Sequence, residues 1–321
     1  MAEYPLKTVF LDYDTVSVGD LDTGALRRAA DDLVLHDMDE SRTADRIRDA
    51  DVVALNAARL SRELLFGASR LKLVALAATG TDNVDLIAAR ERGIAVCNVR
   101  AYCTASVVQQ VWGLILSLTQ HVDGYSRLVR SGSWTSDDLA TVLTLPIREL
   151  QGRVFGVVGW GDLGRGAARV AEAFGMRVLV ANRRGESAQP GRMELTQLLS
   201  VADILSLHCP LNDSTRGLIG AHELALMKPD ALLINTARGA LIDGQALAAA
   251  LKAGRLGGAG IDVLPQEPPL HGDPLLDPEI PNLLLTPHIA WAAREARQRC
   301  IDELAANIVD FRSGGRRCRV V

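Results

Sequence analysis

The 321-residue sequence has no surplus of positive charge, no long apolar run and no closely spaced cysteine pair. Its formal net charge is −4, so it has no basic excess to neutralise a phosphate backbone, and nucleic acid is not an expected partner. The longest apolar stretch, Val111 to Leu118, is too short to cross a bilayer. Asp12 and Asp14 interrupt the segment where a signal peptide needs an apolar core. These absences predict a cytoplasmic protein that binds neither nucleic acid nor membranes.

The five cysteines are odd in number, widely spaced and without a CxxC pair. This pattern favours reduced thiols over a disulfide framework or a zinc site, and we expect no metal. For Cys209, near a predicted strand end, a small apolar filler is the favoured role and a reactive thiol the alternative. Low-complexity tracts and solenoid repeats are also absent. With 48% hydrophobic and 23% charged residues, the chain is long enough for two folded domains.

One segment near the middle of the chain organises the rest. An apolar strand pattern at 154–158 runs into Gly159-Trp160-Gly161-Asp162-Leu163-Gly164, and a helical pattern follows at 165–174. A GxGxxG motif between a strand and a helix predicts a dinucleotide site: its glycines allow, in order, a tight turn, the approach of a pyrophosphate, and close helix–strand packing. The helix N-terminus favours phosphate as well. A glycine turn in an ordinary βαβ unit is the alternative.

Alternating strand and helix patterns flank this segment and predict two parallel α/β units. The first unit has predicted strands at 6–11, 50–55, 71–78 and 94–97, with helices at 20–32 and 85–92. The second has six predicted strands, at 154–158, 178–181, 204–208, 231–235, 260–263 and 283–286, which make a doubly wound sheet.

Two predicted helices mark where the chain passes between these units. An amphipathic pattern at 104–120 leads into the second unit, and another helix follows at about 124–132. A last helical pattern at 292–311 lies outside the strand series and is expected to pack back on the first unit. The predicted organisation is a discontinuous substrate domain, 1–103 and 290–321, around a dinucleotide-binding domain, 104–289.

Polar residues follow several of the predicted strands. The loop Ala78-Thr79-Gly80-Thr81-Asp82-Asn83 follows the third strand, and its backbone N–H groups suit a carboxylate, although a plain capped turn fits about as well. In the second unit, Arg238, Glu267 and His288 follow three different strands. Because parallel strands end at one edge of their sheet, these three side chains are expected to meet beside the dinucleotide.

Each of the three has a distinct task in hydride transfer to a 2-oxo acid. Arg238 offers a planar fork that matches a carboxylate. His288 suits a general acid that protonates the carbonyl oxygen, and Glu267 would orient its imidazole and favour the charged form. The alternatives are a helix-capping arginine, a solvent-facing glutamate and a histidine that merely ends a strand.

At this point the chain resembles the NAD(P)-dependent D-2-hydroxyacid dehydrogenases, most of all their glycerate dehydrogenase (hydroxypyruvate reductase) branch. The motifs that carry the resemblance are ATGTDNVD from Ala78, GWGDLG from Gly159, HCPLNDST from His208, INTARGALID from Ile234, GIDVLPQEPP from Gly260 and TPHIAW from Thr286. The resemblance implies a Rossmann cofactor domain plus a smaller flavodoxin-like α/β substrate domain, and a homodimer.

The same resemblance implies roles for individual residues. Arg238, Glu267 and His288 would form the catalytic set, and Thr79-Gly80, together with Arg238, would hold the substrate carboxylate. The implied coenzyme-binding residues, besides the three motif glycines, are Leu163, Asn182, Arg183, Arg184, Cys209, Pro210, Thr215, Thr236, Ala237 and Asp262.

The sequence departs from the family pattern in two places. Asn182 stands where an NAD-preferring member usually has a carboxylate for the ribose hydroxyls, and Arg183 and Arg184 follow. We therefore expect NADPH to be used at least as well as NADH. The alternative is that these arginines are solvated and that NADH is the preferred coenzyme. Gln110 replaces an expected histidine, and 136–144 lacks an expected phenylalanine, which puts the substrate side chain in doubt.

The leading functional prediction is reversible reduction of a small 2-oxo acid, hydroxypyruvate or glyoxylate, to the D-2-hydroxy acid. The alternative is a dinucleotide-sensing regulator on the same fold, against which an intact Arg238, Glu267 and His288 set argues. Phosphoglycerate dehydrogenase is less favoured because no regulatory domain follows Phe311.

Overall fold

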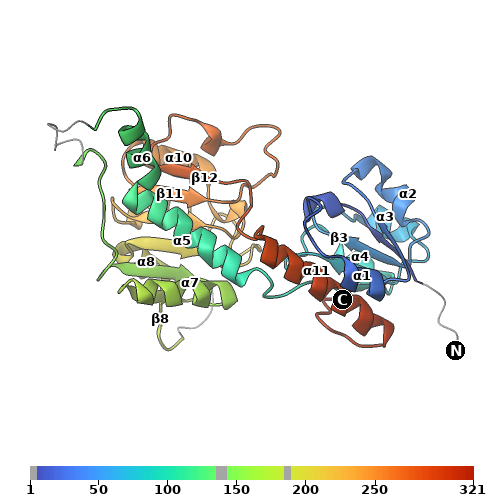
Figure 1. Ribbon diagram of the computed structural model, residues 1–321. Coiled ribbons are helices and arrows are strands. Elements are labelled where there is room, and N and C mark those ends of the chain that lie inside the picture. The colour runs from blue at the N-terminus through green and yellow to red at the C-terminus, as the bar shows by residue number, and fades with distance from the viewer. Residues whose placement is uncertain (1–5, 135–142, 184–188) are drawn as a thin grey trace. The chain divides into compact units, whose positions relative to one another are not determined.

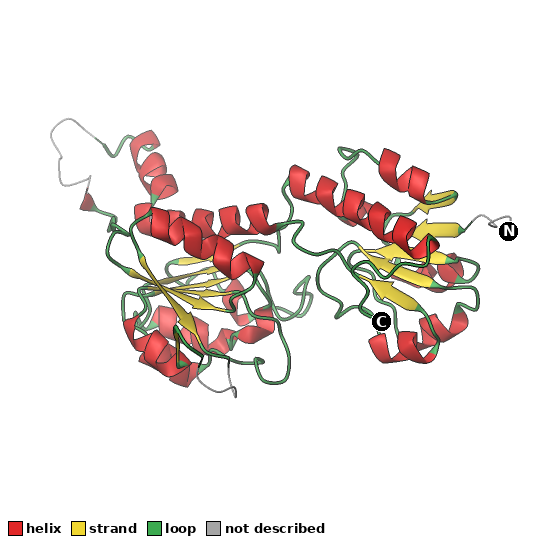
Figure 2. Cartoon of the chain, turned by 90° about the horizontal axis from the view of Figure 1, so that it is seen from below, coloured by secondary structure: helices red, strands yellow, loops and turns green. Residues whose placement is uncertain are grey.

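The computed structural model describes residues 6–134, 143–183 and 189–321. The chain divides into two compact units, Met1–Cys103 with Trp291–Val321, and Thr104–Ala290. In each unit the strands lie between two layers of helices, as Figure 1 and Figure 2 show. No helix in the described part of the chain is both long and apolar enough to span a bilayer.

The first unit is built on a five-stranded parallel sheet with the order β2-β1-β3-β4-β5, a flavodoxin-like arrangement. Its central strands β3 and β4 are buried at every position, as expected for a parallel sheet covered on both faces. The strands are β1 Lys7–Phe10, β2 Asp32–Leu35, β3 Val52–Leu55, β4 Leu73–Leu76 and β5 Ala95–Cys97. The helices are α1 Gly24–Ala29, α2 Thr43–Ile47, α3 Arg62–Gly67, α4 Leu86–Glu91 and α11 Arg294–Arg312, with 3-10 turns η1 Tyr13–Thr15 and η2 Glu40–Arg42.

Helix α11 comes from the far end of the chain and packs in this unit against α1 and β4 (Figure 1). Its Arg297 guanidinium donates to both oxygens of the Asp20 carboxylate, at 2.9 and 2.7 Å. The Asn307 amide donates to the carbonyl of Asn98, at 2.9 Å, in a buried position. These contacts tie the last helix to the beginning of the chain.

The predicted helix at 20–32 is wrong in extent, and strand β2 was not predicted. Helix α1 covers only Gly24–Ala29, because the Asp20 side chain is engaged by α11 and an Asp22 oxygen accepts from the amide of Gly24. After Ala30 the backbone extends and pairs in parallel with β1. Strand β2 lies at the sheet edge with alternating exposure, so its composition carries little strand signal.

The second unit is built on a seven-stranded parallel sheet with the order β12-β11-β10-β9-β6-β7-β8. The direction of winding reverses between β6 and β9, and open α/β sheets bind ligands beyond the carboxyl ends of strands at such a switch point. The strands are β6 Val154–Val158, β7 Arg177–Ala181, β8 Arg192–Met193, β9 Ile204–Leu207, β10 Leu232–Asn235, β11 Gly258–Ile261 and β12 Leu283–Leu285. The two-residue edge strand β8 was not among the six predicted.

The helices of this unit include α5, which begins and ends at the predicted residues. Its indole Trp112 stacks on Phe155 and Phe174, at 5.6 and 4.9 Å between ring centroids, and donates to the carbonyl of Ala167 at 3.2 Å. These contacts fix α5 along the sheet (Figure 1). The helices are α5 Thr104–Gln120, α6 Val122–Arg130, α7 Asp162–Ala173, α8 Leu195–Val201, α9 Ala221–Leu226 and α10 Gly244–Lys252, with 3-10 turns η4 Gly239–Leu241 and η5 Pro274–Leu276.

Candidate active site

The glycine turn after β6 lies at the switch point of the second sheet. Gly159 has φ +101°, and a Cβ there would lie 2.5 Å from the carbonyl carbon of His208, so only glycine allows this turn to pack on the loop after β9. A Cβ on Gly164 would lie 2.1 Å from the carbonyl oxygen of Gly159. Gly161, the N-cap of α7, has no described atom within 4 Å of a Cβ position. The turn is therefore closed on its protein side and open at the helix N-terminus, as a bound pyrophosphate requires.

His288 and Glu267 form a hydrogen-bonded pair at the carboxyl edge of the same sheet. The His288 Nδ1 and Glu267 Oε2 atoms are 2.6 Å apart, and the other Glu267 oxygen accepts from the amide of Leu264 at 2.8 Å. Burial acts to raise the pKa of Glu267, but the hydrogen bond and charge of His288 outweigh it, and the pKa is lowered overall. Glu267 is thus held as a carboxylate that orients the imidazole. His288 Nε2 has no hydrogen-bond partner within the described ranges.

A buried aspartate at the end of β11 fixes the backbone that carries His288. The side chain of Asp262 is fully buried and accepts from the amides of Ile289 and Ala290, at 3.0 and 2.9 Å. Its carbonyl accepts from the amide of His288 at 2.7 Å. Burial raises the pKa of Asp262. These bonds hold His288 at φ +54°, a left-handed conformation that a histidine rarely adopts unaided.

Two side chains of α5 complete this support. Gln110 donates to the hydroxyl of Thr286 at 3.2 Å, and that hydroxyl donates in turn to Asp262. Ser106 donates to the carbonyl of Ala290 at 2.6 Å. From the sequence, Gln110 was noted only as a departure from the family pattern, and Ser106 was given no role at this edge. The one sequence feature that could have indicated a role for Ser106 is its position, as a polar residue, on the apolar face of an amphipathic helix.

Arg238 is held by a different turn, after β10. The Asn235 side chain accepts from the amide of Ala237 and donates to the carbonyl of Arg238, at 3.0 and 2.9 Å. A Cβ on Gly239 would lie 2.0 Å from the carbonyl carbon of Leu264, so glycine lets this turn pack on the segment that leads to Glu267. The charge of Arg238 also helps to lower the pKa of Glu267. The structure therefore brings the three predicted strand-end residues together.

The remaining coenzyme-binding candidates lie mostly at neighbouring strand ends. Thr236, after β10, is buried, and its hydroxyl has no partner among the residues described. Thr215 donates to the carbonyl of Pro210 at 2.8 Å and so closes the loop after β9. Burial raises the pKa of Cys209 to about 11, which favours the filler role over a reactive thiolate. The other candidates in the described chain are Leu163 in the first turn of α7 and Ala237 beside Arg238.

The predicted coenzyme-selecting residues follow β7. Asn182 is buried, at 7% exposure, and its amide nitrogen donates to a Glu194 oxygen at 3.3 Å. Arg183 is exposed, and Arg184 lies outside the described residues. Glu194 was not identified from the sequence, since it is 12 positions from Asn182 and reaches it only because β8 pairs with β7.

His208, after β9, was also missed. Its Nε2 lies 2.8 Å from the hydroxyl of Ser206, and its Nδ1 is buried without a partner in the part of the chain that the structure describes. Burial lowers the pKa of His208 to about 4, so the ring is neutral at pH 7. No group of acidic, histidine and cysteine side chains within the described ranges could hold a metal ion.

In the first unit, the Thr79-Gly80 loop is fixed by its neighbours. The Thr79 hydroxyl donates to the carbonyl of Val99 at 2.8 Å, and the Asn98 amide donates to the carbonyl of Thr79 at 2.7 Å. The amides of Gly80 and Thr81 have no acceptor among the described residues. The Thr79 side chain is thus structural, and the backbone N–H groups are what the loop offers to an anion.

The comparisons with known proteins agree with this geometry. The family model described as "D-isomer specific 2-hydroxyacid dehydrogenase, NAD binding domain" matches residues 112–290, more than half of the chain. The chain belongs to this family. It is therefore a dehydrogenase, an oxidoreductase acting on the CH–OH group of 2-hydroxy acids.

Two curated relatives and one solved structure illustrate what this dehydrogenase is similar to. It is 42% identical to a glycerate dehydrogenase of Methylorubrum extorquens, over 84% of this chain and 85% of that protein. It is 36% identical to a hydroxypyruvate reductase of Blautia hydrogenotrophica, over 96% and 98%. An acyclic imino acid reductase solved with NADPH and D-Arg superposes with a TM-score of 0.86 at 28% identity, covering 98% of this chain and 100% of that one.

Proposed function

We propose that this dehydrogenase reduces hydroxypyruvate or glyoxylate to the corresponding D-2-hydroxy acid. The observation that carries the proposal is the His288–Glu267 pair beside Arg238 at the carboxyl edge of the second sheet. The choice of substrate follows the names of similar proteins, which include a glycerate dehydrogenase, a hydroxypyruvate reductase and a glyoxylate reductase of Thermococcus litoralis.

Each of the three residues has one task in this proposal. His288 Nε2 donates a proton to the carbonyl oxygen of the substrate, and takes it back in the reverse reaction. Glu267, on the other ring nitrogen, stabilises the imidazolium form and fixes the tautomer. The Arg238 guanidinium binds the substrate carboxylate through its planar fork. The nicotinamide coenzyme, when bound, supplies the hydride.

The residues of the second unit fit a dinucleotide. The open position beside Gly161 and the N-terminus of α7, including Leu163, would hold the pyrophosphate. The loop after β9 would contact the coenzyme through Cys209 and Pro210, on the nicotinamide side, and through Thr215, which closes the loop. We place Thr236, Ala237 and Asp262 on the nicotinamide side, because they follow β10 and β11, next to the strands that lead to Glu267 and His288.

The first unit supplies the substrate-binding loop in this proposal. The amides of Gly80 and Thr81 are available to a second anion contact, since the Thr79 hydroxyl is engaged by Val99. The unit that contains this loop, residues 1–103 with the last helix, is the proposed substrate domain, and 104–290 the coenzyme domain.

We further infer that NADPH serves at least as well as NADH. Asn182 cannot repel a 2′-phosphate as a carboxylate would, and Arg183 follows it with an exposed side chain. A ratio of kcat/KM for the two coenzymes checks this, and a large preference for NADH contradicts it.

A cytoplasmic homodimer completes the proposal. The exposed apolar side chains of Val122 and Val129 on α6 are the kind of surface that an interface covers. Light scattering coupled to gel filtration measures the mass in solution; a monomer of 34.5 kDa at micromolar concentration contradicts the dimer.

A substrate panel tests the function itself. Absorbance of NADPH and of NADH is followed with hydroxypyruvate, glyoxylate, pyruvate and 2-oxoglutarate at saturating coenzyme. We expect the highest kcat/KM with hydroxypyruvate or glyoxylate. Binding of either coenzyme without turnover of any of the four acids contradicts the proposed substrates, and a clear preference for 2-oxoglutarate contradicts a small R group.

A further inference from the structure

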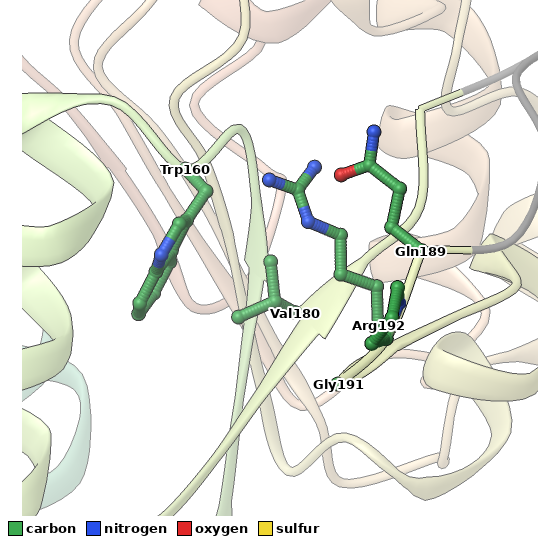
Figure 3. Close-up of a pocket in the computed structure, with 6 residues that line it drawn as sticks. Trp160, Val180, Gln189, Gly191 and Arg192 are labelled. Atoms are coloured by element: carbon green, nitrogen blue, oxygen red, sulfur yellow. The ribbon is translucent and has the colours of Figure 1, made fainter.

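A cavity of about 380 Å³ lies beside the end of β7. Its volume is in the range of sites that hold small ligands. It is lined by Trp160, Val180, Gln189, Pro190, Gly191 and Arg192 (Figure 3). Trp160 lies within the predicted glycine motif. The other five residues were not among the predicted coenzyme-binding residues.

Three elements meet at this cavity, and all belong to the nucleotide end of the second unit. Trp160 lies within the glycine turn, between Gly159 and Gly161. Val180 is two residues before Asn182, and it pairs directly with Arg192 of β8. In this fold the residues that follow the second strand contact the adenosine ribose. The cavity therefore adjoins the position where the 2′ substituent of the coenzyme is recognised.

Arg192 presents its charge to this cavity. Figure 3 shows its guanidinium directed toward the space between the Trp160 ring and the Gln189 amide. The side chain is half-buried, and no carboxylate of the described residues lies within 4 Å of it. A partly desolvated guanidinium without a counter-ion is suited to a phosphate, which it can bind with two parallel hydrogen bonds.

Glu194 contributes the opposite charge two residues later. It occupies the N-cap position of α8, but its side chain does not cap that helix and accepts instead from Asn182. One N–H of the buried Asn182 amide is thereby engaged by the carboxylate of an exposed residue. Asn182 thus has less to offer a ribose phosphate than its place in the sequence indicates.

We propose that Arg192 binds the 2′-phosphate of NADPH and helps to select this coenzyme, while Glu194 positions Asn182 and limits the phosphate affinity by its charge. This inference rests on the proposed use of NADPH, and it adds Arg192 of β8 to the residues that would select this coenzyme.

Direct binding tests this assignment without turnover. Dissociation constants of NADPH and NADH are measured by calorimetry for the wild type and for Arg192→Met, which keeps an apolar stem and removes the charge. We expect a tenfold or larger weakening for NADPH and less than a twofold change for NADH. Arg177→Met is the matched control, because Arg177 is exposed at the amino end of β7 and should leave both constants unchanged.

A second variant tests the role of Glu194. Glu194→Gln keeps an oxygen that can accept from Asn182 and removes the negative charge. It should strengthen NADPH binding about threefold and leave NADH binding unchanged. An unchanged or weaker affinity for NADPH contradicts this part of the proposal.

Two results would overturn the assignment of Arg192. An equal loss for both coenzymes would mean that the side chain packs on the adenine, and no loss for either would mean that it lies outside the site. Because no 2-oxo acid is present, these results are independent of the substrate panel. A wild type that binds NADH far more tightly than NADPH contradicts the proposed coenzyme preference, whereas the ratio between the variants still reports on Arg192.

Discussion

In each of the two units, a buried aspartate at the carboxyl edge of the sheet accepts hydrogen bonds from the backbone amides of a loop, but the two loops differ in the side chains that they carry. In the first unit Asp12, just after β1, accepts from the amides of Asn56, Ala57 and Ala58, at 2.9, 2.6 and 2.7 Å. In the second, Asp262 holds the loop after β12 in the same way. Both aspartates are fully buried, and burial raises the pKa of both.

The difference lies in what the held loop carries. The loop on Asp12 bears an asparagine and two alanines, whereas the loop on Asp262 bears His288 in a left-handed conformation. A buried carboxylate that collects backbone amides is therefore a structural device first. In the proposed mechanism, only the segment held by Asp262 also presents a titratable side chain, His288. Three sets of variants test this difference between the two loops.

The largest contrast is expected between the side chains on the two loops. His288→Ala removes the proposed proton donor and should lower kcat by about 10²- to 10⁴-fold. Asn56→Ala, at the corresponding place in the first unit, should leave kcat within about threefold of the wild type, because Asn56 carries no titratable group and its bonds to Thr15 and Asn83 are structural. Steady-state kinetics with hydroxypyruvate measures both. Near-full turnover of the His288 variant would contradict the proposed role of His288 as proton donor.

A smaller contrast is expected between the aspartates themselves. Asp262→Asn and Asp12→Asn should each lower the free energy of unfolding by about 1–3 kcal/mol, since each leaves a backbone amide poorly paired. Only Asp262→Asn should also lower kcat, by about tenfold or more, through the position of His288. Urea denaturation and kcat are measured on the same samples. An equal loss of kcat in both variants would mean that the first loop is also part of the catalytic machinery.

The smallest effect concerns pH. Burial raises the pKa of both aspartates, so their contribution to stability grows as the pH falls toward their unfolded values. His208 acts in the opposite direction: its pKa is lowered from 6.5 to about 4, so its contribution is present above pH 6.5 and is lost as the pH falls toward 4.

Replacement of His208 isolates its contribution to the pH dependence of stability. Between pH 7 and pH 4.5, the free energy of unfolding of His208→Gln should fall by about 2 kcal/mol less than that of the wild type. Gln is chosen because its amide can still reach Ser206 in place of Nε2. Parallel pH curves for the two proteins would show that His208 is protonated in the folded state without cost.

Much of the fold was predictable because buried parallel strands are continuous apolar runs. Strands β3, β4, β6, β9 and β10 are buried throughout and lie within or close to the predicted ranges. The edge strands β2 and β8 were not predicted, because they are short and only partly buried and so lack a continuous apolar run. Helix α1 is shorter than predicted because Asp20 is engaged by α11, nearly 280 residues away.

Some residues of the candidate site were likewise predictable from the sequence, and others were not. Arg238, Glu267 and His288 could be placed together because strand ends of a parallel sheet share one edge. The residues that hold them could not, because Gln110 and Ser106 reach that edge across 176 and 184 residues of sequence. Long-range hydrogen bonds of this kind leave no periodic pattern in the chain.

The small edge strand β8 has one further consequence. It is paired on one side only, and it carries Arg192 two residues before Glu194. The charges of Arg192 and Glu194, which are not part of the buried core, can thus change without disturbing the hydrogen bonds around His288. Under the proposed assignment of Arg192, the choice of electron donor and the chemistry on the substrate are free to evolve separately in such enzymes, and exchange of Arg192 and Glu194 is the expected route to redirect the enzyme from one cellular coenzyme pool to the other.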